Sequence, residues 1–330
     1  MRHAALLAFV LAVAHAAAVA APAPAVFAPG YTHSCPSNDA CIAAVLTAAR
    51  EGRQIDQLAM MVSMGRAAGP RSAVNQPGAQ RPARALETVA VGNVDAMLAA
   101  LLISRQGDYA ALPENWRMSA LFLLKSNKAD EAERVLRDGI SVFPTHAAFW
   151  TDLALVFGQQ GKVDDAVGAL LVADTWSENP AALRQGYAQA AKDAPIKPLG
   201  AIYAAALQAI EANTAALERF DASLPAVSLA SDAGNVDKGP APVVRFDTCP
   251  MPQYPRVSAR YEESGRVTLA FYVDADGKLL RAKKLASSGY IELDNATLTG
   301  IAACAFKPAR SEGKNLPAWA KVQYVWSLEN

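Results

Sequence analysis

The chain has 330 residues, more than one typical domain core holds, so we expect at least two folded units joined by linkers. Lysine and arginine together number 31, as do aspartate and glutamate, and the formal net charge is zero. Nucleic acids and anionic membrane surfaces attract proteins that have a basic footprint, so neither is expected as a partner. The composition is 52% hydrophobic but only 7% aromatic, and its many alanines favour helices over most of the length.

The first residues have the pattern of an export signal. A basic start, "MRH", precedes a short apolar run, and small residues follow it. This pattern predicts a cleaved signal peptide over 1–21 and, after it, an N-terminal segment over 22–41 of a periplasmic protein. The same apolar run is just long enough to span a bilayer, so an inner-membrane anchor facing the periplasm is the alternative. Membrane association is expected only through such an anchor or through partners.

The chain contains four cysteines, at positions 35, 41, 249 and 304. An even number in an exported chain indicates disulfides, and four cysteines allow three connectivities. The lengths of the intervening segments favour Cys35 with Cys41 and Cys249 with Cys304. The spacings contain no C-x-x-C pair, and no histidine lies near the C-terminal two, so neither a metal site nor a cofactor is expected.

Residues 42–219 repeat apolar side chains at spacings of three and four, which predicts an all-α domain. The segment 220–242 has no sustained period and is rich in Ser, Gly, Pro and Asp, which is typical of a linker. Within the helical part, "NWRMSALFLLKSNKADEAERVL" (115–136) aligns with "FWTDLALVFGQQGKVDDAVGAL" (149–170), and the period is 34 residues. The alignment pairs Trp116 with Trp150.

These units resemble tetratricopeptide repeats, which have this period and place small residues where their helices approach. Two such units cannot bury their faces alone, so neighbouring segments must complete the stack. The segment 89–102 has the pattern of a degenerate earlier unit, and 179–192 with 199–213 that of a capping pair. Repeats of this kind serve either as a concave peptide-binding surface or as a helical spacer, and the sequence leaves both possibilities open.

The periodicity changes to two after the linker. In "RVTLAFYVDADGKLLRAKKLASSG" (266–289) apolar residues alternate, and Asp276-Gly277 marks a tight turn between two strands. A helix is expected over 291–304 and a last strand over 318–329. The order strand, strand, helix, strand predicts a small three-stranded antiparallel sheet with one helix, and the fold class of the whole chain is α+β.

The C-terminal unit, residues 243–330, resembles the C-terminal domain of TonB, the periplasmic arm of the system that powers outer-membrane receptors. The resemblance is carried by "PQYP" (252–255), "SGRVTLAFYVDADGKL" (264–279), "SSG" (287–289), "LDNA" (293–296), "FKPA" (306–309) and the closing aromatic strand. Their order and spacing, more than any single motif, carry the similarity.

The resemblance implies that an outer-membrane receptor adds a short peptide as a further strand at the edge of the sheet. Edge strands have unpaired N–H and C=O groups that an extended peptide can satisfy. The proline-rich lead-in is "CPMPQYPR" (249–256). The expected partner-binding residues lie in this lead-in and in the last strand: Gln253, Tyr254, Val322, Gln323, Tyr324, Val325, Trp326 and Ser327. The side chains of Tyr324 and Trp326 are expected to pack in the core, which leaves their backbones for pairing.

The chain also departs from the family. TonB keeps an uncleaved membrane helix and a long proline-rich arm, whereas a helical repeat domain stands in that place here. We therefore expect a periplasmic TonB-like protein that binds a receptor peptide. The alternatives are an envelope scaffold that binds through its repeats and, if the N-terminal segment is not cleaved, a membrane-anchored energy transducer.

No enzyme is expected. The strongest catalytic spacing, the S-x-x-K match from Ser311 to Lys314, falls in a turn before the last strand, away from the helix start at which acylating serine enzymes place it. His33 and His146 have no evident nucleophile or acid partner in the sequence.

Overall fold

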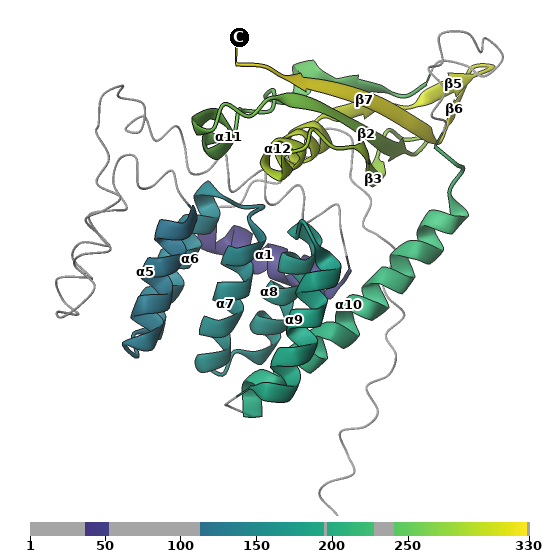
Figure 1. The fold of residues 1–330 in the computed structure, drawn as a ribbon. Coiled ribbons are helices and arrows are strands. Elements are labelled where there is room, and N and C mark those ends of the chain that lie inside the picture. The colour runs from purple at the N-terminus through teal and green to yellow at the C-terminus, as the bar shows by residue number, and fades with distance from the viewer. Residues whose placement is uncertain (1–36, 53–112, 195–196, 228–240, 329–330) are drawn as a thin grey trace, which may run out of the picture.

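The computed structural model describes residues 37–52, 113–194, 197–227 and 241–328. The expected signal peptide, Cys35 and the degenerate unit at 89–102 lie outside these ranges. The described residues form a group of helices and a small sheet that lies across one end of the group (Figure 1).

The helical domain consists of consecutive antiparallel helices that stand side by side (Figure 1). Helix α5 pairs with α6, α7 with α8, and α9 with α10. The first two hairpins coincide with the two 34-residue units, so this part of the chain is consistent with a helical repeat domain; its assignment to the tetratricopeptide type stays a prediction. The bounds are α1 Asn38–Arg50, α5 Pro113–Lys125, α6 Ala129–Val142, α7 Ala147–Gln159, α8 Val163–Trp176, α9 Pro180–Asp193 and α10 Lys197–Ser223.

Equivalent residues of the two units have equivalent surroundings. Trp116 and Trp150 are each the fourth residue of their helix, and both are buried, with exposed fractions of 2% and 0%. The turn after each first helix contains a residue in the left-handed region, Asn127 with φ 59° and Gly161 with φ 74°. Such a residue ends a helix without strain when it is Gly or Asn. The repeat is therefore visible in the backbone as well as in the packing.

Helix α1 completes the core of this domain by packing on α8 and α6. Ile42 and Leu46 are buried on its inner face, and the Asn213 side chain of α10 donates from Nδ2 to the Ala49 carbonyl at 3.2 Å. The helix begins at Asn38, four residues before the expected start of the domain, because the Ser37 side chain caps it.

The other end of the helical domain also differs from the prediction. We expected a linker from residue 220, but α10 runs to Ser223. Residues 220–224 contain neither proline nor glycine, and Asp221 is held by a partner in the C-terminal unit. The helix therefore continues past the expected start of the linker.

The C-terminal unit contains the predicted strand, strand, helix, strand order. Strands β2 (Gly265–Val273), β3 (Leu279–Ala286) and β7 (Ala318–Trp326) form an antiparallel sheet in the order β3-β2-β7. Helix α12 (Ile291–Ala302) packs against one face of this sheet. The α+β fold class and the three-stranded sheet are confirmed.

Short elements that the sequence did not predict surround this frame. Strand β1 (Val243–Arg245) pairs with β4 (Ala305–Lys307), and β5 (Ala309–Ser311) pairs with β6 (Lys314–Leu316). A 3-10 turn, η2 (Phe246–Thr248), precedes the proline-rich lead-in, and helix α11 (Arg256–Arg260) follows its last proline. The S-x-x-K residues are the β5–β6 hairpin itself, since Ser311 lies opposite Lys314.

Replacement of either repeat tryptophan by alanine should destabilise the helical domain. Trp116→Ala and Trp150→Ala should each lower the free energy of unfolding by about 3–5 kcal/mol, because each leaves a large cavity in a packed core. Thermal unfolding followed by far-UV circular dichroism measures the loss. Met118→Ala is the control on the same helix, since Met118 is 63% exposed and should change little. Equal behaviour of all three variants would contradict the assigned packing.

Candidate functional site

Strand β7 is an edge of the sheet. It pairs with β2 along its whole length, from Gly265 opposite Trp326 to Val273 opposite Ala318, without a shift in register. Among the described residues no strand pairs with its other side. The direction of each backbone N–H group along β7 therefore decides what this edge can bind.

A hydrogen bond in the turn after β2 shows which way the backbone N–H groups point. The Asp274 N–H donates to the Lys278 carbonyl at 2.9 Å, on the side of β3. Backbone groups alternate between the two sides of a strand, so the preceding residue, Val273, faces β7. Its partner in the register is Ala318, which accordingly faces β2.

The same alternation continues along β7. Ala318 and every second residue after it face β2, so Gln323 and Val325 point their N–H and C=O groups away from the sheet. Both side chains are also exposed, and Val325 has 58% of its surface in solvent. An extended chain can thus pair with the backbone here without displacing a core side chain.

The inner side chains of β7 join the core and contact the lead-in. The Trp326 ring is 4% exposed, and its Nε1 donates to the Thr297 hydroxyl of α12 at 2.8 Å. The Tyr254 ring packs edge-on against the Trp326 ring with their centres 5.0 Å apart, and the Tyr324 ring does the same with centres 4.9 Å apart. The Tyr254 hydroxyl donates to the Glu263 carbonyl. Burial raises the pKa of both tyrosines, which stay neutral near pH 7.

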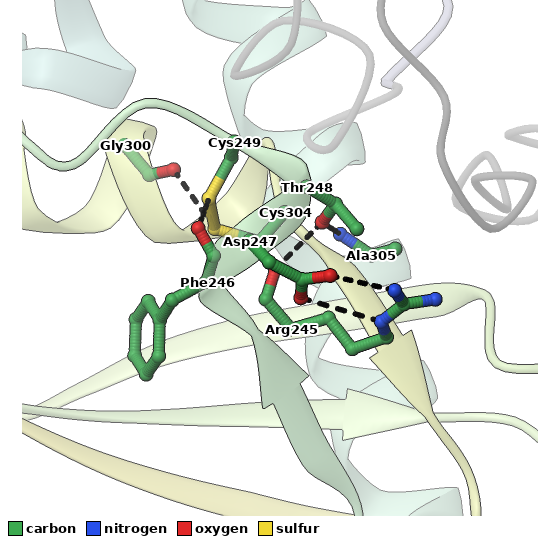
Figure 2. The surroundings of a disulfide bond; sticks show 8 residues. All are labelled: Arg245, Phe246, Asp247, Thr248, Cys249, Gly300, Cys304 and Ala305. Atoms are coloured by element: carbon green, nitrogen blue, oxygen red, sulfur yellow. Dashed lines mark hydrogen bonds and ion pairs between the residues drawn. A yellow bond between two sulfur atoms is a disulfide. The ribbon is translucent and has the colours of Figure 1, made fainter.

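The lead-in is fastened to α12 at two points. A disulfide joins Cys249 to Cys304 just after the end of the helix, with the two Cα atoms 4.8 Å apart (Figure 2). Three residues further along, the Pro252 ring lies against Gly300, where a Cβ atom would come within 2.8 Å of the proline ring. The close approach requires glycine at this position.

Hydrogen bonds hold the residues just before the disulfide. Thr248 accepts from the Ala305 N–H at 2.8 Å and donates to the Arg245 carbonyl at 2.6 Å (Figure 2). Closing a loop of 55 residues would stabilise the unit by about 4 kcal/mol in the chain-entropy account of disulfides. The lead-in therefore reaches the end of β7 along a fixed path.

A buried carboxylate that the sequence analysis did not single out organises the loop before α12. The Asp294 side chain is 1% exposed and accepts from Lys284 Nζ at 2.8 Å, from the Ser287 hydroxyl and from both the N–H and the hydroxyl of Ser288. Burial opposes ionisation, but these donors outweigh it and lower the pKa of Asp294. Asp294 thus holds β3 to the start of α12.

Residues 250–328 match the family model for the Gram-negative bacterial TonB protein C-terminal. This unit is a TonB C-terminal domain. No curated protein and no solved structure matches the chain. TonB C-terminal domains are non-enzymatic interaction domains of the cell envelope, and the match indicates a TonB-like protein involved in envelope transport.

The TonB domain brings together most of the residues named from the sequence. Tyr254, Tyr324 and Trp326 form one aromatic cluster, and Val322 packs beside them against the core. Gln323 and Val325 are exposed on the edge strand, and Ser327 follows its last residue. Gln253 is exposed next to Tyr254 in the lead-in.

The predictions about an N-terminal disulfide, a metal site and a membrane anchor can be compared with the described residues. Cys41 is disulfide-bonded, whereas its expected partner, Cys35, lies outside the described residues. Across the described ranges, no group of His, Cys, Asp and Glu side chains could hold a metal ion. Within the same ranges, every helix is too short or too polar to cross a bilayer.

Removal of the Asp294 charge should destabilise the TonB domain. Asp294→Asn should lower the free energy of unfolding by about 2 kcal/mol at pH 7, because an amide cannot accept the four hydrogen bonds that a carboxylate accepts. The pKa of Asp294 is lower in the folded chain, so its contribution is full above the unfolded value of about 4 and is lost as pH falls through the folded value.

Urea unfolding at several pH values measures both effects. The difference between wild type and Asp294→Asn should therefore narrow below about pH 4. Asp276→Asn, in the exposed turn after β2, is the matched control and should leave stability unchanged. A difference between wild type and Asp294→Asn that stays constant from pH 7 to pH 3 would be inconsistent with an ionised Asp294.

Proposed function

We propose that this is a periplasmic TonB-like protein that binds an extended peptide of an outer-membrane receptor by strand addition to β7. The observation that carries the proposal is the orientation of Gln323 and Val325, which turn their backbone groups toward an edge that no described strand covers. The domain match supports the same kind of partner, since the family serves envelope transport.

The geometry favours main-chain recognition over a side-chain pocket. A strand laid beside β7 would pair with the N–H and C=O groups of two residues and continue the sheet, and each hydrogen bond contributes about 0.5–1.5 kcal/mol net. The Trp326 side chain that anchors β7 is already committed to Thr297 and to the two tyrosines. It therefore holds the strand in place for the peptide without contacting the peptide itself.

In this proposal the lead-in lies beside the end of the binding edge. Tyr254 packs on Trp326 at the end of β7, and Gln253 is the exposed residue beside it. An amide side chain at this place can hydrogen-bond to the last backbone groups of an added strand. We assign this supporting role to Gln253.

Proline substitutions on the edge test the proposal directly. Gln323→Pro and Val325→Pro each remove an outward-pointing N–H, and edge strands tolerate proline, so the domain should fold and lose its partner. The measurement is capture of a receptor from envelope extract by the full-length exported protein. Gln323→Ala and Val325→Ala are the matched controls, because they remove the side chain and keep the N–H, and both should capture the receptor as wild type does.

Two results would contradict strand addition. Proline variants that fold and capture the receptor as well as wild type would show that the edge backbone is not used. Alanine variants that lose capture as completely as the proline variants would show that side chains, and not the backbone, make the contact.

A further inference from the structure

The face of the sheet opposite α12 meets the end of α10. Asp221, in the last turn of this helix, accepts from Arg281 of β3 with both carboxylate oxygens, at 2.7 Å from Nε and 3.1 Å from Nη2. Lys283 Nζ lies 3.1 Å from the same carboxylate. Two cations of the TonB domain thus converge on one acid of the helical domain.

A second contact lies beside the first. The Trp319 indole, on the second residue of β7, donates from Nε1 to the Pro225 carbonyl at 2.7 Å. Its ring lies 5.2 Å from Tyr272 of β2, and Lys283 Nζ is 5.4 Å from its centre. The end of the helical domain therefore touches side chains from β3 and β7, and the contact between Lys283 and Trp319 joins them.

The ion pair between Asp221 and Arg281 is largely shielded from solvent. The Arg281 side chain is 10% exposed and that of Asp221 is 24% exposed. Burial opposes ionisation of Asp221, but the hydrogen bonds and charges of Arg281 and Lys283 outweigh it and lower its pKa. A bidentate pair of this kind also fixes the relative orientation of the two groups, which a single flexible contact does not.

The two domains also touch at a second place. His146, just before α7, lies with Nδ1 3.3 Å from Glu292 Oε1 in the first turn of α12. Both side chains line a cleft of about 510 Å³ between the helical domain and the TonB domain. Contacts at two places, one on each face of the sheet, restrict rotation of one domain against the other more than either does alone.

We propose that the end of α10, through Asp221 and Pro225, is a latch that reaches the outer face of the sheet and holds the helical domain to the TonB domain. The latch makes the two domains move as one body. Because Trp319 belongs to β7, the latch and the proposed binding edge share one strand; the latch itself does not rest on the proposed function.

Reversal of the Asp221 charge tests the latch. Asp221→Arg places a third cation beside Arg281 and Lys283, so the contact should open, and a cation in the last turn of a helix leaves the helix intact. Small-angle scattering of the full-length protein should then show a larger radius of gyration. Acrylamide should also quench tryptophan fluorescence more strongly, because Trp319 is half-buried whereas the other four tryptophans, Trp116, Trp150, Trp176 and Trp326, are buried.

Asp247→Arg is the matched control. Asp247 also pairs with an arginine, Arg245 at 2.6 Å, but this pair is exposed and lies within the TonB domain. The control should keep the scattering profile and the quenching of wild type. Asp221→Asn, which removes the charge at constant shape, should shift both readouts in the same direction as Asp221→Arg, and it decides the question if the arginine variant fails to fold.

A folded Asp221 variant with the radius of gyration and quenching of wild type would overturn the latch. This result is distinguishable from failure of strand addition, because neither readout uses a peptide or a receptor. Conversely, proline variants that lose receptor capture should keep the scattering profile of wild type.

Discussion

The central position of β2 is the constraint on which the rest of the C-terminal unit depends. A three-stranded sheet has one interior strand, and here it is the strand whose residues from Val267 to Val273 are all buried. Such a strand needs cover on both faces, and α12 supplies it on one side while the end of α10 meets the other. The same order leaves β7 with one open side, so the feature that stabilises the sheet also creates the edge that we propose as the binding site.

The proline-rich lead-in supports the edge strand from the side of α12. Proline fixes φ and has no N–H to leave unpaired, so a lead-in with several prolines can cross the end of a helix without forming secondary structure of its own. The disulfide and the Pro252–Gly300 contact then fasten it to α12, and Tyr254 completes the core around Trp326. The proline-rich lead-in thus contacts both the helix and the last strand.

Much of this architecture could be predicted from the sequence, because long elements have long-range periodicity. The alternation in β2 and β7 and the 34-residue spacing of the tryptophans each extend over many residues, and both led to elements that the structure contains. The ribbons β1–β4 and β5–β6 have strands of three residues, too short for any period to show. The contact between Asp221 and Arg281 joins residues 60 positions apart, and nothing local to either residue predicts it. The motifs "SSG" and "LDNA" were recognised, but that Asp294 binds the serines became clear only from the hydrogen bonds.

Amide hydrogen exchange of β7, measured residue by residue with and without the bound receptor, tests the central claim most directly. In the protein alone, the amides of Gln323 and Val325 should exchange rapidly, while those of Val322 and Tyr324, which face β2, should exchange slowly. Binding of the receptor should slow Gln323 and Val325 and leave the other two unchanged. Slow exchange of Gln323 and Val325 in the free protein, or exchange that the receptor does not alter, would contradict strand addition at this edge.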